Sequence, residues 1–532
     1  MTTPDRLRTT LALGALAVAL TLAGCSSSDQ GADESPSGSS ADRGIDASHY
    51  AESYGQDGSA DAAGPHGDDT FVDHGTSGYV DPQEDPESTF ALDVDTGSFS
   101  VAKSLLAQGV RPPAASIRAE EWVNSFDYGD EAPDDDALAV HAETGLDPDA
   151  ADGGQLVRVA VTSRELSEYD RPRAHVTLVV DRSGSMDMDE RLGLVKSSLA
   201  VLANELRGDD TVAVVSFDDV ATPILEPTPV RDTEAVLAAV DRLQPGGSTN
   251  LEDGLRLGYE QARASYEDDA VNVVVLCSDG VANVGDTMPD SIVDTIAEEG
   301  AAGIHLVTVG FGMGNYNDHL MEQLADQGDG FYSYVDTYDE AERLFGTELT
   351  TTLLPVAAEA RAQVRFDSDR VSSYRLVGYE DRAMDDQDFE DLAVDAGELG
   401  PGHHATALYE VELADGVAPG EEIGIAELRW VDPDDGEGHR AATEVRSASE
   451  RSPGAGFELA SLVADTALHL KNADYGEGYG EDYGEDYGEG YGEEPWSDLG
   501  DLERRAAVLA EAEVAGAEEL LAVIRQAELA EG

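Results

Sequence analysis

The chain has 532 residues, and its 111 Asp and Glu side chains outnumber its 32 Lys and Arg side chains, so the formal net charge is −79 at pH 7. A chain this acidic repels nucleic acid and anionic lipid headgroups, which excludes both as electrostatic partners. It contains only two cysteines, Cys25 in an apolar N-terminal segment and Cys277 in a predicted buried strand, so no disulfide is expected.

The N-terminus has the features of an export signal. Two arginines precede the apolar run Leu11–Leu22, which is too short to cross a bilayer as a helix. The run leads into the sequence LAGC, which resembles the lipobox of bacterial lipoproteins. The resemblance implies that residues 1–25 are a lipoprotein signal and that Cys25 becomes the lipidated first residue of a chain anchored to the cell membrane or envelope on its extracytoplasmic side. The alternative is an ordinary signal peptide that contains a cysteine.

Two segments separate this signal from the centre of the chain. Residues 26–85 are rich in Ser, Gly, Asp and Ala without an apolar period, which predicts a disordered acidic linker. From residue 86 the composition changes, and 86–172 is predicted to be a small α+β region. Apolar alternation indicates strands at 90–94, 138–142 and 156–162, and helical periodicity indicates helices at 98–108 and 116–126.

Strands and helices alternate throughout the central domain, residues 173–354. Strands are predicted at 175–180, 211–217, 271–277, 304–310 and 331–335, and helices at 191–206, 233–243, 251–266, 291–299, 317–326 and 338–351. Such alternation predicts an α/β fold, a doubly wound and mostly parallel sheet with helices on both faces. The length suits one domain.

Oxygen-bearing side chains follow the first strand of this domain. Asp181, Ser183 and Ser185 form a D-x-S-x-S loop directly after a buried β-branched run. Ligands of open α/β sheets bind at the carboxyl ends of the strands, where this loop lies. One carboxylate and two hydroxyls suit a hard cation, but three oxygens are too few to hold one.

Two later loops can supply the missing oxygens. The glycine-rich turn 245–250 places Thr249 at the start of a predicted helix, and Asp279 comes directly after the strand 271–277. This order of residues resembles the metal-ion-dependent adhesion site of von Willebrand factor type A domains, and all five positions match: Asp181, Ser183, Ser185, Thr249 and Asp279. Helix capping by Ser and Asp explains one or two of these residues, but not five from three loops.

The resemblance implies a bound Mg²⁺, with Mn²⁺ and Ca²⁺ as alternatives. Ser183 and Ser185 would coordinate the ion directly, Thr249 directly or through water, and the two aspartates mainly through water. Mg²⁺ prefers six oxygens and keeps several waters. Two carboxylates offset its charge and leave one position open, which an Asp or Glu of a partner protein can fill.

A glycine-rich loop follows the strand 304–310. Gly310, Gly312 and Gly314 suggest a dinucleotide-binding turn, but asparagine stands at both positions where the motif G-x-G-x-x-G requires its last glycine. We therefore expect a loop at the carboxyl edge of the sheet, near the metal site.

The remaining sequence changes from α/β to β and then to helix. Strands alternate through a β-rich domain, 355–450, and with the strands that precede the central domain they could form one β domain into which it is inserted. Helices are predicted at 457–471 and 502–529, within the C-terminal segment 451–532. Between them lies an acidic insert, 474–494, with a tyrosine at every fourth position, which predicts a disordered, solvated loop.

From about Thr89 to its end, the order of these segments resembles the bacterial von Willebrand factor A lipoproteins of the YfbK kind, although the tyrosine-rich insert departs from them. The resemblance implies a binding role and no settled biochemical activity. We therefore expect a cation-dependent protein-binding module rather than an enzyme. A metal-dependent envelope hydrolase is the first alternative, but neither H-E-x-x-H nor G-x-S-x-G occurs. A structural envelope-assembly protein is the second, and it leaves the five-residue site unexplained. The partner and the oligomeric state do not follow from the sequence.

Overall fold

The structure is a computed structural model of the whole chain. It describes residues 71–92, 95–133, 136–147, 154–165, 171–279, 290–312, 318–348, 355–380, 382–392, 394, 396–433, 436–449, 451–472 and 498–531. The export signal with Cys25, the linker up to residue 70, most of the glycine-rich loop after Gly312 and the tyrosine-rich insert lie outside the described residues. Within these ranges, no helix combines the length and the apolar character that a membrane span requires.

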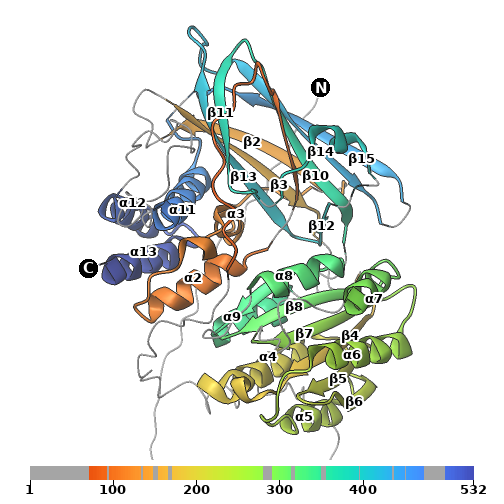
Figure 1. Cartoon of the computed structure of the whole chain (residues 1–532). Helices are drawn as coiled ribbons and strands as arrows, with labels where there is room; N and C mark the ends of the chain where they lie inside the picture. Colours follow the sequence, from red (N-terminus) through yellow and green to blue (C-terminus); the bar gives the residue numbers. More distant parts are fainter. Residues whose placement is uncertain are drawn as a thin grey trace, which may run out of the picture. The chain divides into compact units, whose positions relative to one another are not determined.

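The central domain is built on a six-stranded sheet in its described part (Figure 1). The strand order is β6-β5-β4-β7-β8-β9, and every pairing is parallel except that of β6 with β5. The strands are β4 (Ala174–Asp181), β5 (Thr211–Phe217), β6 (Thr222–Pro229), β7 (Val271–Ser278), β8 (His305–Phe311) and β9 (Tyr332–Val335). The predicted fold class, a doubly wound and mostly parallel sheet, is confirmed.

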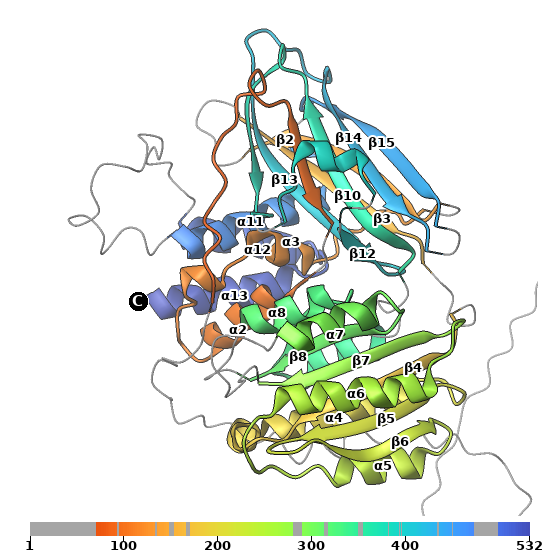
Figure 2. The ribbon, with the colours of Figure 1, turned by 45° about the vertical axis from the view of Figure 1, so that its right-hand side comes forward.

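Helices cover both faces of this sheet, and Figure 2 shows α6 lying across one of them. Successive side chains of a strand point to opposite faces, so Val179 packs with the α6 side while Leu178 and Val180 pack with the α4 side. The helices of the first face are α6 (Leu251–Ser265), α7 (Asp290–Gly300) and α8 (Asp318–Gln327). Those of the second face are α4 (Arg191–Glu205), α5 (Thr233–Asp241) and α9 (Tyr338–Glu342), which the π-helical segment Arg343–Glu348 follows.

The strand β6 was not predicted from the sequence. It contains Pro223, Pro227 and Pro229, and proline in a run normally argues against a strand because it cannot donate a backbone hydrogen bond. In the structure β6 is the edge strand, antiparallel to β5, where one side of the backbone needs no partner in the sheet. An edge strand tolerates proline for this reason.

A β-sandwich flanks the central domain and is made of segments from both sides of it. The first sheet has the order β1-β10-β14-β15, with β12 beside β10, and the second has the order β11-β13-β3-β2. Both sheets contribute to one apolar core, so the central domain is inserted between β3 and β10. The strands are β1 (Glu87–Ala91), β2 (Leu138–Leu146), β3 (Gln155–Ser163), β10 (Ala357–Phe366), β11 (Val371–Val377), β12 (Gly397–Leu399), β13 (His404–Leu413), β14 (Glu422–Val431) and β15 (Gly438–Arg446).

Residues 71–85, which the sequence assigned to the disordered linker, contact this sandwich instead. Val80 exchanges two backbone hydrogen bonds with Tyr374 of β11, at 2.8 and 3.1 Å. The Tyr374 hydroxyl donates to the carbonyl of Asp85 at 3.1 Å. These contacts join residues far apart in the sequence, so the composition of the segment could not reveal them.

Five helices form a separate apolar cluster. They are α2 (Gly97–Ala107), α3 (Ala119–Asn124), α11 (Ala455–Asn472), α12 (Leu499–Glu511) and α13 (Ala517–Glu531) among the described residues. The single helix predicted at 502–529 is wrong, because a turn separates α12 from α13. Glu513 and Gly516 adopt φ values of 58° and 78° there, which no α-helix accommodates.

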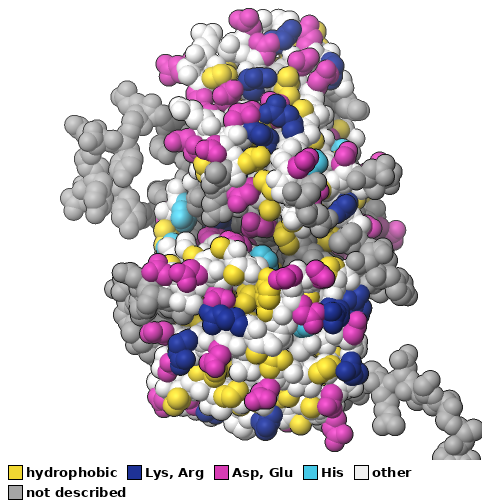
Figure 3. Space-filling view, turned by 90° about the vertical axis from the view of Figure 1, so that its right-hand side faces the viewer, with side chains coloured by type: hydrophobic (Ala, Val, Ile, Leu, Met, Phe, Trp, Pro, Cys, Tyr) yellow, Lys and Arg dark blue, Asp and Glu magenta, His cyan; other side chains and the backbone are white. Residues whose placement is uncertain are grey.

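On the face in Figure 3, Lys and Arg side chains lie among the Asp and Glu side chains. Among the described residues, Arg440 and Glu390 form an exposed pair of this kind, with a distance of 2.6 Å between guanidinium and carboxylate.

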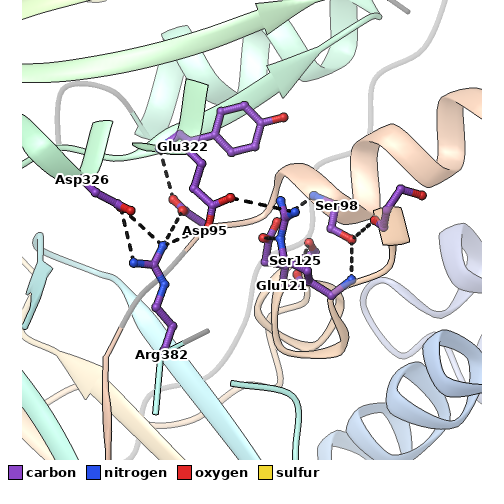
Figure 4. Close-up of polar contacts among 10 residues, drawn as sticks. Asp95, Ser98, Glu121, Ser125, Glu322, Asp326 and Arg382 are labelled. Carbon is purple, nitrogen blue, oxygen red and sulfur yellow. Dashed lines mark hydrogen bonds and ion pairs between the residues drawn. The ribbon is translucent and has the colours of Figure 1, made fainter. Parts of the chain in front are cut away.

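Charged side chains also link the central domain to the flanking regions (Figure 4). Arg382, which follows β11, lies 3.3 Å from Asp95 and 3.4 Å from both Glu322 and Asp326 of α8. Asp95 in turn accepts a hydrogen bond from the backbone of Tyr332 in β9 at 3.1 Å. We call Arg382 and its three carboxylates the joint cluster.

Candidate metal centre

The five predicted metal ligands lie in three loops at the carboxyl edge of the central sheet. Asp181 is the last residue of β4, and Asp279 follows its parallel neighbour β7. The loop with Ser183 and the loop with Thr249 are joined by backbone hydrogen bonds, from Gly184 to Gly247 at 3.2 Å and from Gly246 to Arg182 at 2.7 Å. The structure therefore brings together the three loops that the sequence singled out.

Asp181 is fully buried and rigidly held. Its Oδ1 accepts a hydrogen bond from the Ser183 backbone and its Oδ2 accepts one from the Ser278 hydroxyl, both at 2.7 Å. Burial, and then the negative charge of Asp279, raise the pKa of Asp181 to about 6. Two carboxylates close enough to perturb each other in a buried place favour the binding of a cation between them.

The two serines present their hydroxyls side by side. Ser183 Oγ and Ser185 Oγ are 3.0 Å apart, and either can donate to the other. Ser183 is buried and Ser185 is partly exposed. Two adjacent hydroxyl oxygens can turn their lone pairs toward one hard cation, which matches the ligand preference of Mg²⁺ and Ca²⁺.

Asp279 gives the clearest indication that this is a cation site. Its side chain is 0% exposed, and its Oδ2 accepts a hydrogen bond from Arg191 Nη1 at 2.9 Å. Its Oδ1 is buried and has no hydrogen-bond partner among the described residues. A buried carboxylate oxygen without a partner is costly, so a cation or its bound water is expected there. The donors present fit a hard divalent cation.

The turn before Thr249 needs its glycines. Gly247 has φ +83°, and a Cβ at this position would lie 2.7 Å from the Cβ of Asp218. Asn250 then starts α6: its backbone donates to the Asp218 carbonyl at 2.8 Å, and its side chain accepts from the Asp253 backbone at 3.2 Å. The glycine pair therefore lets the loop approach β5 and sets Thr249 at the head of α6.

Sequence reasoning missed Arg191, which it treated only as the first residue of a helix. A cation at a helix N-terminus opposes the helix dipole, and no acidic residue lies in the first turn of α4, although Asp189 and Glu190 directly precede it in the sequence. That unfavourable position was the one signal in the sequence that Arg191 has a specific partner. Its pairing with Asp279 depends on the packing of α4 beside β7.

Other reactive groups lie away from these loops. Cys277 is buried in β7, and burial raises the pKa of its thiol. His403 and His404 lie at the start of β13, in the sandwich. In the described part of the chain, no group of three or more His, Cys, Asp and Glu side chains could hold a metal ion. The candidate centre differs from such a group because three of its five candidate metal ligands, those of Ser183, Ser185 and Thr249, are hydroxyl groups.

Three segments of the chain match known family models. Residues 175–347 match the von Willebrand factor type A domain, and residues 351–483 match a model described as the C-terminal part of the uncharacterized protein YfbK. Residues 65–158 match a model described as von Willebrand factor. The first match covers the whole candidate metal centre.

Similar proteins occur in bacteria and in animals. The YfbK protein of Escherichia coli is 35% identical over 355 residues, which cover 65% of this chain and 61% of that protein. This chain thus spans less than two thirds of the length of YfbK. An uncharacterized protein of Synechocystis sp. is 29% identical over 57% of this chain and 72% of its own length. The human inter-alpha-trypsin inhibitor heavy chain H3 is 28% identical over 30% of this chain and 18% of its own length.

Solved structures also align with the chain. A von Willebrand factor type A protein from Catenulispora acidiphila aligns with a TM-score of 0.36 and 18% identity over 61% of this chain and 75% of its own. The ArnB paralog VWA2 from Sulfolobus acidocaldarius aligns with a TM-score of 0.34 and 13% identity, over 74% of this chain and 96% of its own.

Proposed function

This chain is a YfbK-like protein with a von Willebrand factor type A domain, and on that premise we propose that the domain binds an acidic protein ligand through a divalent cation. The observation that carries the proposal is the buried Oδ1 of Asp279, which has no hydrogen-bond partner among the described residues, at a sheet edge where hydroxyl donors gather. Mg²⁺ is the proposed ion, with Mn²⁺ and Ca²⁺ as alternatives.

Each of the five residues has a distinct task in this proposal. Ser183 and Ser185 donate oxygen ligands directly, and Thr249 does so directly or through water. Asp181 and Asp279 supply the negative charge. The hydrogen bonds from the Ser183 backbone and from Ser278 keep Asp181 in place before the cation arrives. The bound cation supplies an open coordination position that a carboxylate of the partner can occupy.

We propose binding rather than catalysis because of the side chains in these loops. The segments 181–187, 218–221 and 245–250 contain no His, Cys or Lys, which are frequent bases and nucleophiles. Of the three further carboxylates there, Asp218 pairs with Arg182, Asp219 accepts a hydrogen bond from the Ser248 hydroxyl, and Asp187 is exposed. A hydrolytic role would have to use a carboxylate of these segments as its base, or a base from outside them.

The metal dependence can be tested by partner capture. The full chain, immobilised, is incubated with solubilised envelope proteins in Mg²⁺ or in EDTA. Wild type should retain proteins in Mg²⁺ and lose them in EDTA, and both Asp279→Ala and Ser183→Ala should retain none. Ser197→Ala is a matched control, because Ser197 is as buried as Ser183 but bonds only to the α4 backbone.

Equal capture by all variants in both buffers would contradict the metal-bridged mechanism. Turnover of a substrate that depends on Mg²⁺ would instead support the enzyme alternative. Titration calorimetry with MgCl₂ alone, on wild type and Asp279→Ala, shows whether the cation binds at all.

We also propose that the protein is a lipoprotein of the cell envelope, exposed on the extracytoplasmic side. The support is the sequence LAGC, which ends at Cys25 after an apolar run. Cys25→Ser should release the protein from membranes into the soluble fraction, since a lipid chain could no longer be attached. Retention of the variant on salt-washed membranes would show that another feature anchors the chain.

A further inference from the structure

The candidate centre contains a cation of the protein's own. Arg191 Nη1 lies 2.9 Å from Asp279 Oδ2, and the two side chains are only 3% and 0% exposed. This ion pair uses only Oδ2 of the Asp279 carboxylate. The other oxygen, Oδ1, has no hydrogen-bond partner within the described residues. Arg191 therefore neutralises Asp279 while one oxygen of Asp279 stays available for another cation.

A glycine after the next strand makes room for this arginine. Gly312 follows β8, the parallel neighbour of β7, and has φ +77°. A Cβ on Gly312 would lie 2.4 Å from Arg191 Nε, closer than two atoms without a bond can approach. Asp279, after β7, thus binds the guanidinium through an ion pair, and Gly312, after β8, leaves the space that the guanidinium occupies.

The charges of the centre give this arginine a consequence for metal binding. Among the three buried charged groups Asp181, Asp279 and Arg191, the two carboxylates balance a divalent cation, and the guanidinium leaves one positive charge in excess. In a buried place, where charges are weakly screened, that excess opposes the binding of a divalent cation. The same excess favours an anionic group at the open coordination position. In the loop 181–190, which leads from β4 to Arg191, the only Lys or Arg in the sequence is Arg182, and it pairs with Asp218.

We propose that Arg191 strengthens the coupling between metal binding and ligand binding, by keeping the affinity for the cation low until a carboxylate of the partner restores neutrality. This inference rests on the proposed function and names the regulation of that site. It also specifies the ligand, because an uncharged oxygen donor would not remove the excess charge.

Calorimetric titration of the full chain with MgCl₂ tests the coupling, in buffers with and without a saturating tri-aspartate peptide and at constant ionic strength. The peptide should tighten Mg²⁺ binding to wild type about tenfold, by the size of one partly screened unit charge. Arg191→Gln should bind Mg²⁺ about tenfold more tightly than wild type without peptide. The peptide should tighten Mg²⁺ binding to this variant by a smaller factor than to wild type, because a carboxylate that coordinates the ion tightens its binding in every variant.

Three further variants separate charge from structure. Arg191→Lys keeps the charge and should behave as wild type. Gly312→Ala pushes the guanidinium away from Asp279 and should shift Mg²⁺ affinity in the same direction as Arg191→Gln. Arg171→Gln is the matched control, since Arg171 and Asp210 form a buried pair, 9% and 0% exposed, at the opposite edge of the same sheet. It should lower the thermal midpoint equally with and without Mg²⁺ and leave Mg²⁺ affinity unchanged.

The outcomes distinguish this inference from the proposed function. If Arg191→Gln and wild type bind Mg²⁺ equally and respond equally to the peptide, Arg191 is only structural and the inference fails, while loss of binding in Asp279→Ala would still support the metal centre. If wild type binds no Mg²⁺ in either buffer, both fail.

Discussion

At the scale of single residues, the centre is held by polar groups that pair with one another in a buried place. Asp181 receives two hydrogen bonds, Ser183 lies beside Ser185, and Asp279 divides its two oxygens between Arg191 and a position with no protein donor among the described residues. Such an arrangement stabilises the protein only when every charge has a counterpart. This is why we expect the cation and the arginine to act on the same carboxylate.

The pH dependence of stability can be predicted from His403, at the start of β13. Burial, and then the nearby His404, lower the pKa of His403 from its ordinary 6.5 to about 4. Between these values the unfolded chain binds a proton that the folded chain does not, so the free energy of unfolding should fall as the pH drops from about 6.5 to about 4. The full loss corresponds to about 3 kcal/mol.

Urea unfolding of wild type and His403→Gln between pH 7 and pH 5 measures this contribution. The variant should show the shallower decrease. His439→Gln serves as the control, because His439 is exposed on β15. Parallel curves for wild type and His403→Gln would refute the assignment.

At the scale of elements, the turn between α12 and α13 is the place where the sequence pattern and the structure differ. Apolar residues recur at helical spacing on both sides of the turn, so the pattern predicts one continuous helix. In the hairpin, Phe126, in the segment after α3, packs against Gly516, where a Cβ would come within 2.6 Å of its ring. Helical periodicity carries no information on such a contact with a distant segment.

Gly516→Ala should destabilise the helical cluster by about 2–3 kcal/mol, because it adds a steric clash to the strain of a positive φ. Gly402→Ala measures the cost of the backbone strain without a steric clash. Gly402 has a similar φ of +73°, and no atom lies within 4 Å of the position that its new methyl group would take. This substitution should cost about 1 kcal/mol. Chemical unfolding of both variants, followed by circular dichroism, gives the difference. Equal losses would mean that Phe126 moves aside at no cost.

At the scale of the whole described chain, the central domain interrupts the sandwich and is tied back to it. Both connections start from the sandwich, after β3 and before β10. Helix α2 joins the parts further: its Val101 and Leu105 belong to the core of the central domain, whereas Phe99 and Leu106 belong to the helical cluster. The joint cluster adds an electrostatic link between α8 and the segment after β11.

Removal of the joint arginine should loosen the central domain without unfolding it. Arg382→Met deletes the cation between Asp95, Glu322 and Asp326, and we expect the unfolding free energy of the central domain to fall by about 1–3 kcal/mol. Hydrogen exchange should then be faster in α8 and β9, with the sandwich unchanged. Arg440→Met, which removes an exposed pair with Glu390, is the control and should change neither. Unchanged exchange in α8 would show that the apolar contacts of α2 suffice.

The sequence by itself determined the fold class of the central domain and the five candidate ligands. Hydrophobic periodicity is a local property, and so is the spacing of Asp181, Ser183 and Ser185. Thr249 and Asp279 could be added because the carboxyl ends of parallel strands meet at one edge, whatever the strand order. These predictions required no knowledge of which strands are neighbours.

Only the tertiary structure decided the features that depend on neighbours distant in the sequence. Arg191 meets Asp279 and Gly312 because α4 packs where β7 and β8 end side by side, and strand order leaves no mark in local periodicity. The sandwich likewise pairs β3 with β13, on opposite sides of the whole central domain. The proline-rich β6 is a strand because it lies at a sheet edge, where one side of its backbone needs no partner.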